Sequence, residues 1–88
     1  MINSEKPIRF SAHALGYTAR RGFTAADVET VIRNGKWSLA DDGRFQAHMD
    51  FPFNADWNGR FYATRQVKPV FVENDTEIVV VTVYTYYF

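Results

Sequence analysis

The residues best suited to chemistry near the start of this chain lie on one predicted helix. His13, Tyr17, Arg20 and Arg21 are separated by one and two helical turns, so their side chains can reach one locus. An imidazole titrates near neutral pH and can act as a general acid or base. A guanidinium group is suited to bind phosphate. This helix therefore offers the groups that would hold a phosphate ester and move a proton.

A second set of polar groups lies at the end of the chain. Thr82 and Tyr84 share one face of the strand predicted over residues 78–88. Cleavage of RNA without a metal needs a base for the 2′-hydroxyl, an acid for the leaving oxygen, and positive charge or hydroxyl donors for the transition state. The helix and the strand together contain these groups, provided that the fold brings them together.

Each of these residues also has an ordinary structural interpretation. A His beside two arginines on a helix is commonly solvated, and Tyr84 and Tyr86 are good strand formers. His48 alternates with Gln46, which is typical of a surface strand residue rather than a second catalytic imidazole. The spacing alone leaves both interpretations open.

Composition restricts the class of protein. Eighty-eight residues, 47% of them hydrophobic, suffice for one small domain spanning residues 1–88. No Cys is present, and ten basic residues balance ten acidic ones, so contact with RNA must come from a local patch. The sequence has no metal-ligand spacing, no glycine-rich phosphate loop, no secretory leader and no apolar run that could span a membrane. We therefore expect a cytoplasmic protein without a cofactor or a metal.

Two helices are predicted in the first half of the chain. Ser11 is a natural N-cap for a helix that runs to about Arg21, and Gly22 lies where a helix usually ends. Residues 24–27 form a capping box that begins a second helix, which ends at Asn34-Gly35. These elements predict a helical hairpin.

Beyond Lys36 the pattern changes to a period of two, which predicts strands. Strands are expected at 37–40, 44–49, 60–67 and 78–88, with a further extended segment at 70–72, turns at 41–43, 58–59 and 74–75, and a loop at 50–57. Pro69 should mark a bend, a bulge or an edge, because proline cannot donate to a ladder. The predicted fold is α+β: a short strand, then two helices packed on one face of an antiparallel sheet of about four strands.

The last strand should press one face against the helices. Val79, Val81 and Val83 are predicted to form that face, with Thr82, Tyr84 and Tyr86 on the other. In this arrangement His13 reaches the hydroxyl groups only if the first helix ends at the rim of the sheet.

Three segments of the chain resemble a known family. Residues 10–14, 21–28 and 81–84, which read FSAHA, RGFTAADV and VTVY, resemble the framework of the small bacterial family DUF4258. That family is grouped with the barnase/EndoU/colicin/RelE class of metal-independent ribonuclease folds and is associated with toxin–antitoxin systems. The resemblance implies a RelE/barnase-like fold and a catalytic set at matching positions, namely His13, Arg21, Thr82 and Tyr84.

We therefore expect a metal-independent endoribonuclease, the toxin of a toxin–antitoxin-type system, with RNA as substrate and an antitoxin or other small protein as partner. Arg20, Tyr17 and Arg60 are the predicted substrate-binding residues. The alternative is a non-catalytic interaction domain that pairs with another protein through its apolar C-terminal strand.

Overall fold

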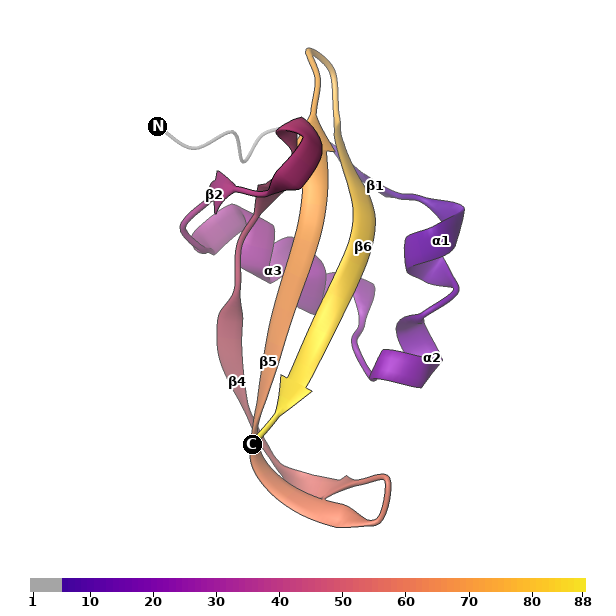
Figure 1. The fold of residues 1–88 in the computed structure, drawn as a ribbon, viewed down its shortest axis with the longest axis vertical. Coiled ribbons are helices and arrows are strands. Elements are labelled where there is room, and N and C mark those ends of the chain that lie inside the picture. The colour runs from indigo at the N-terminus through magenta and orange to yellow at the C-terminus, as the bar shows by residue number, and fades with distance from the viewer. Residues whose placement is uncertain (1–5) are drawn as a thin grey trace.

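The computed structural model describes residues 6–88, which form a mixed α+β fold (Figure 1). Its elements in chain order are β1 (Ile8–Phe10), α1 (Ala12–Leu15), α2 (Thr18–Arg21), α3 (Ala25–Asn34), β2 (Ser38–Leu39), the 3₁₀ turn η1 (Asp41–Gly43), β3 (Phe45–Gln46), β4 (Met49–Trp57), β5 (Arg60–Glu73) and β6 (Ile78–Tyr87). The α+β class predicted from the sequence is confirmed.

The sheet is larger than the predicted one of about four antiparallel strands. The described residues form six strands in the order β1-β6-β5-β3-β2, and β4 also pairs with β5. β1 is parallel to β6, whereas the other strand pairs are antiparallel. The short extended segment before the helices thus joins the sheet and covers the start of β6.

The first predicted helix, over residues 11–21, is two short helices that separate at Gly16. Ser11 caps α1 as predicted, since its Oγ accepts a backbone N–H of the first turn at 3.1 Å. Glycine is a poor helix former. The Thr18 hydroxyl donates to the Leu15 carbonyl at 2.6 Å, a local bond of the kind that competes with a regular helix. The break lets α1 and α2 follow the edge of β6 (Figure 1).

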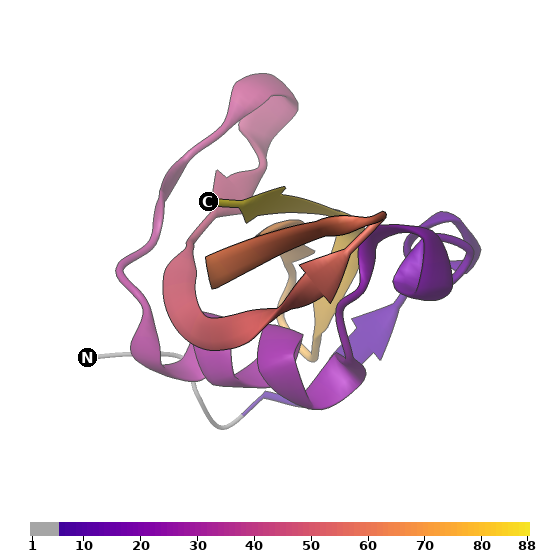
Figure 2. The same cartoon turned by 90° about the horizontal axis from the view of Figure 1, so that it is seen from below.

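α3 begins and ends as the sequence predicts. Thr24 Oγ1 accepts the Asp27 N–H at 3.1 Å, and the Asp27 carboxylate accepts the Thr24 N–H at 3.3 Å, which completes the capping box. The helix crosses one face of the sheet and buries an apolar core against it (Figure 2). The core residues are Ala14, Phe23, Val28, Val31, Ile32, Ala47, Val67, Phe71, Ile78, Val80 and Val83.

Residues 50–57 form most of strand β4 and not the predicted loop. β4 pairs with β5 on both sides of an irregularity between Pro52 and Ala55, where Asn54 has a φ of 47°. Proline and asparagine favour loops locally, but pairing with the long strand β5 outweighs that preference. The predicted hairpin turn at 58–59 is confirmed, with φ values of 52° and 82° that fit a type I′ turn.

Pro69 lies inside the continuous strand β5 and is fully buried. Thr64 and Phe88 exchange backbone hydrogen bonds. In an antiparallel pair such residues alternate, so the even-numbered residues of β5 up to Val70 form hydrogen bonds with β6. The backbone of the odd-numbered Pro69 therefore faces the strands on the other side of β5. There Ala47 N–H donates to the Pro69 carbonyl at 3.4 Å, and proline has no N–H to return. This missing bond falls between β3 and β4, which explains why they are separate strands.

β6 contains a bulge next to this site. Val70 pairs with Thr82 and Phe71 with Val80, so Val81 is an extra residue without a partner on β5. An extra residue shifts the alternation of side chains by one position. The two halves of β6 therefore present opposite sets of residues to the core.

Because of this bulge, the residues of the last strand that face the core differ from the predicted ones. Ile78 and Val80 are fully buried before it, and Val83 is fully buried after it. The prediction is wrong at positions 79 and 81 and right at 83. A run of β-branched residues suits either register, so the sequence offers no signal for the shift.

The face of the sheet opposite α3 holds the second predicted set of side chains. We call it the open face; on β5 and β6 its members are Gln66, Lys68, Val70, Thr82, Tyr84 and Tyr86. The chain between α3 and β3 curls beside one end of this face (Figure 2).

Candidate functional site

The Arg21 side chain reaches from the end of α2 to β6. Its Nη1 donates to the Val83 carbonyl at 2.7 Å and to Thr82 Oγ1 at 3.4 Å. Its Cζ lies 5.2 Å from the ring centre of Tyr84. Among residues 6–88 both hydrogen bonds of this guanidinium come from Nη1, so Nε and Nη2 keep donors that could bind an anion.

Tyr17 lies between the guanidinium groups and the imidazole. The Cζ of Arg21 is 3.9 Å and the Cζ of Arg20 is 5.1 Å from the centre of the Tyr17 ring, within the range of cation–π attraction. The His13 ring meets the Tyr17 ring edge-on, with centroids 4.8 Å apart. His13 is thus linked to the hydroxyl groups of β6 through Tyr17 and Arg21 rather than by direct contact.

The structure therefore brings together six of the seven predicted site residues. We call them the Arg21 cluster: His13, Tyr17, Arg20, Arg21, Thr82 and Tyr84. The seventh, Arg60, begins β5 in the hairpin opposite Trp57. It lies eight residues along the strand from Lys68, a separation of at most about 26 Å, because a strand rises about 3.3 Å per residue. The hydrogen bonds and ring contacts that join the other six residues do not include Arg60, and its role in substrate binding stays a prediction.

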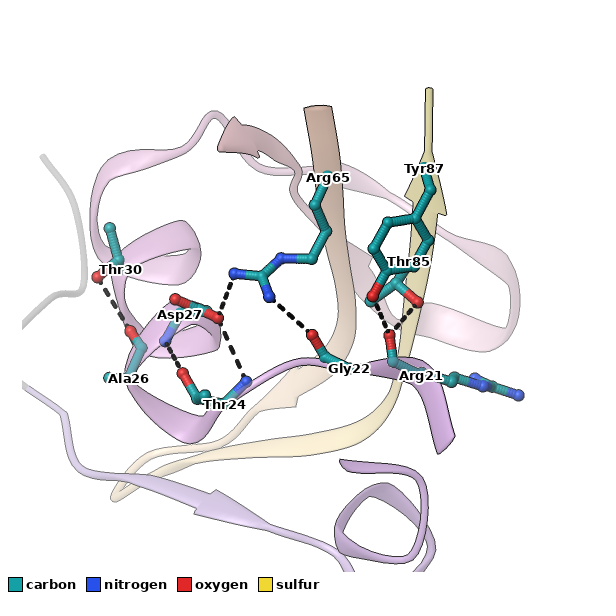
Figure 3. Close-up of polar contacts among 9 residues, drawn as sticks. All are labelled: Arg21, Gly22, Thr24, Ala26, Asp27, Thr30, Arg65, Thr85 and Tyr87. Carbon is teal, nitrogen blue, oxygen red and sulfur yellow. Dashed lines mark hydrogen bonds and ion pairs between the residues drawn. The ribbon is translucent and has the colours of Figure 1, made fainter. Parts of the chain in front are cut away.

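The backbone that carries Arg21 is held from the sheet (Figure 3). Thr85 Oγ1 and the Tyr87 hydroxyl both donate to the Arg21 carbonyl, at 2.7 and 2.8 Å. Arg65 Nη1 donates to the next carbonyl, that of Gly22, at 2.8 Å. In Figure 3 the Arg21 side chain extends away from these bonds. Side chains on the core side of β6 thus fix the backbone of Arg21, and from there its guanidinium reaches Thr82 and Tyr84 on the open face.

Gly22 ends α2 in a conformation that few other residues could adopt. Its φ is +74°, and a Cβ there would collide with the Tyr87 hydroxyl and come within 2.7 Å of Trp57. Tyr87 stacks on Trp57, with ring centres 4.8 Å apart. Burial raises the pKa of Tyr87 above its ordinary value of 10.0, although the positive charge of Arg65 opposes the shift.

A pocket of about 420 Å³ adjoins the cluster on the open face. Thr82 and Tyr84 belong to both, so a group held by Arg21 would lie at the rim of the pocket. The pocket is lined by Leu39, Ala40, Asp41, Asp42, Arg44, Gln46, Lys68, Val70, Thr82 and Tyr84. Its charged groups are of both signs, which suits a ligand that has both an anionic group and hydrogen-bond donors.

Two residues of this surface were not among the predicted site residues. Lys68 pairs with Tyr84, and its Nζ lies 6.0 Å from the centre of that ring. Gln46 pairs with Val70, and residue 49 pairs with residue 67. The same register places His48, which lies between them, across from Lys68. The alternation of β3 and β4 indicated that His48 is exposed, but only the strand pairing places it in one row with Lys68 and Tyr84.

Within residues 6–88, no group of three or more His, Asp or Glu side chains is placed to hold a metal ion. No helix in that part of the chain is long and apolar enough to cross a membrane. The chain matches no protein-family model, no curated protein and no solved structure. The class that the fold and the site define is thus a small α+β protein with a cluster of basic, aromatic and hydroxyl groups beside an open sheet face.

Proposed function

We propose that this protein is an endoribonuclease that cleaves RNA without a metal ion at the Arg21 cluster. The observation that carries the proposal is the reach of Arg21 across the edge of β6, which joins the residues of the first helices to Thr82 and Tyr84. The free Nε and Nη2 donors of Arg21 match two oxygens of a phosphodiester. His13 lies on the other side of Tyr17, on the same edge of the sheet.

The chemistry is a transfer of the phosphoryl group within the RNA. Neutral His13 takes the proton of the 2′-hydroxyl, the 2′-oxygen bonds to phosphorus, and the bond from phosphorus to the 5′-oxygen breaks. The Tyr84 hydroxyl gives its proton to the leaving 5′-oxygen and is reprotonated through solvent from the His13 imidazolium. Arg21 and the Thr82 hydroxyl stabilise the charge on the phosphoryl oxygens. The products are a 2′,3′-cyclic phosphate and a 5′-hydroxyl.

The test is cleavage of end-labelled RNA in EDTA by the wild type and by His13→Ala and Arg21→Ala. We expect the rate to fall about 100-fold or more in each variant, the range for loss of a general base or of one transition-state donor. Lys36→Ala is the matched control, since it removes one exposed positive charge outside the Arg21 cluster. Mass spectrometry should find the cyclic phosphate.

Equal activity in the wild type and His13→Ala would remove the imidazole from the mechanism. Absence of cleavage on every RNA tested would end the catalytic proposal. Circular dichroism of each variant shows whether the fold is retained, so that a loss of rate is assigned to chemistry and not to unfolding.

The resemblance to DUF4258 supports a biological role as the toxin of a toxin–antitoxin-type system, with an antitoxin as the protein partner. Induced expression of the wild type should arrest growth of a bacterial host, and the Arg21→Ala variant should not. Co-expression of the product of a neighbouring gene should restore growth if that product is the antitoxin. Equal growth with the wild type and Arg21→Ala would contradict this role.

A second function, recognition of another protein by strand addition, is favoured by the last residues of β6, beside which residues 6–88 place no strand on the side away from β5. β1 pairs with β6 only as far as Val80. Because even-numbered residues beyond the bulge bond to β5, the backbone groups of Thr85 and Tyr87 face the opposite edge. A partner strand there would protect the Thr85 and Tyr87 amides from hydrogen exchange. Unchanged exchange in the complex would exclude this mode of binding.

A further inference from the structure

The end of the open face carries a row of exposed aromatic rings. Tyr84, Tyr86 and Phe88 are 42%, 45% and 58% exposed, respectively. Phe88 continues the ladder beyond β6, since it exchanges two backbone hydrogen bonds with Thr64. All three residues therefore point to the same side of the sheet, away from α3.

The spacing of these rings suits unstacked nucleobases. Alternate residues of an antiparallel strand are about 6.8 Å apart. Stacked bases in a duplex are separated by about 3.4 Å, half that distance. A single strand stretched to about twice its duplex rise would thus place successive bases beside successive rings.

The neighbouring strand provides polar partners along the same row. Lys68 pairs with Tyr84 and Gln66 with Tyr86, so a cation and an amide lie beside the first two rings. Arg21 approaches Tyr84 from the edge of the sheet, and its Nε and Nη2 are free to bind phosphate. Asp50 pairs with Gln66 on the other side of β5, and the Gln66 amide donates a hydrogen bond to the Asp50 carboxylate at 2.9 Å.

This arrangement favours nucleic acid over a protein partner. The centre of a protein interface is depleted of charge, whereas here cations flank the ring at one end of the row. Aromatic rings that alternate with basic and amide groups are typical of surfaces that bind single-stranded nucleic acid, because every base has a face that can stack.

We propose that Tyr84, Tyr86 and Phe88 form a stacking track for three consecutive bases of single-stranded RNA. The track leads from the Arg21 cluster toward the C-terminus. It deepens and rests on the proposed function, because it names an unpaired strand as the substrate and states where the nucleotides next to the scissile phosphate bind.

The test measures binding of a fluorescein-labelled 2′-O-methyl RNA octamer by fluorescence anisotropy, with the full chain. This probe lacks the 2′-hydroxyl nucleophile and is not cleaved. Tyr86→Ala and Phe88→Ala should each raise the Kd about fivefold to 100-fold, the effect of losing one stacked base. Tyr86→Phe keeps the ring and should stay within about twofold of the wild type. Leu15→Ala is the control, because Leu15 is an exposed apolar residue, 53% accessible, on α1 and outside the row of rings.

Wild-type affinity in both alanine variants, or an equal loss in Leu15→Ala, would overturn the track. If the wild type cleaves RNA but the track variants bind the octamer as the wild type does, the track is wrong and the catalytic proposal stands. Track-dependent binding without cleavage would retain the track and remove the catalytic proposal. The last measurement is sedimentation velocity without RNA. If the wild type is a dimer and Tyr86→Ala is a monomer, this row of rings binds a second copy of the chain, which would contradict the track.

Discussion

Gly22 illustrates how one residue controls the site without taking part in chemistry. It combines a φ of +74° with close contact to Tyr87 and Trp57, whereas Gly43 has a φ of +71° and open space around its missing Cβ. Alanine substitutions at Gly22 and Gly43 can therefore distinguish the cost of backbone strain from the cost of a steric collision.

We expect Gly22→Ala to lower the free energy of unfolding by about 3 kcal/mol or more, because it adds a collision with the Tyr87 hydroxyl and the Trp57 ring to the strain. Gly43→Ala has only the strain and should cost about 1 kcal/mol. Urea denaturation of both variants measures the difference. Equal losses would show that the rings beside Gly22 move aside freely.

Tyr87 gives a prediction for alkaline pH. Its pKa is raised in the folded protein, chiefly by burial, so above pH 10 the unfolded chain loses this proton first. The stability that depends on this proton is fully present below about pH 10 and is lost as the pH rises through the folded pKa.

Unfolding in urea between pH 8 and pH 11 should therefore show a steeper loss of stability in the wild type than in Tyr87→Phe. The variant starts lower by about 1 kcal/mol, because the hydrogen bond to the Arg21 carbonyl is lost. Parallel curves for the two proteins would show that Tyr87 ionises alike in the folded and unfolded states.

At the scale of elements, α3 is the support on which the sheet packs, and its stability depends on its N-terminus. Thr24→Ala removes the hydroxyl that accepts the Asp27 N–H and should cost about 1 kcal/mol. Thr30→Ala is the matched control, since that hydroxyl only donates to a carbonyl one turn earlier in an exposed part of the same helix. Thermal denaturation compares the two. A loss in Thr30→Ala as large as in Thr24→Ala would mean that the capping box contributes nothing specific.

At the scale of the whole molecule, ten basic and ten acidic residues cancel, so attraction to RNA must be local. If Arg21 and Lys68 each neutralise one phosphate, the logarithm of the binding constant should fall with the logarithm of salt concentration with a slope of about −1.4. Anisotropy titrations of the 2′-O-methyl octamer between about 50 and 200 mM salt measure this slope. Lys68→Gln should reduce its size by about half, and a slope steeper than about −4 would indicate a much broader basic surface.

Some features were determined by the sequence alone, because their causes are local. Ser11 and the capping box at Thr24 specify where α1 and α3 begin, and Asn58-Gly59 specifies the hairpin, since each supplies a backbone conformation or a hydrogen bond within a few residues. The spacing of His13, Tyr17 and Arg21 likewise indicated that they share a locus, even though their helix is broken at Gly16.

Other features were decided only by the tertiary structure, because they depend on pairing between distant segments. Residues 50–57 became a strand because β5 lay beside them, and the bulge at Val81 changed which side chains of β6 enter the core. The same pairing placed Lys68 and His48 in line with Tyr84, and it put Arg60 opposite Trp57 in the hairpin of β4 and β5. The reach of Arg21 to Thr82 depends on hydrogen bonds from residues more than 60 positions away, and no local pattern could have specified it.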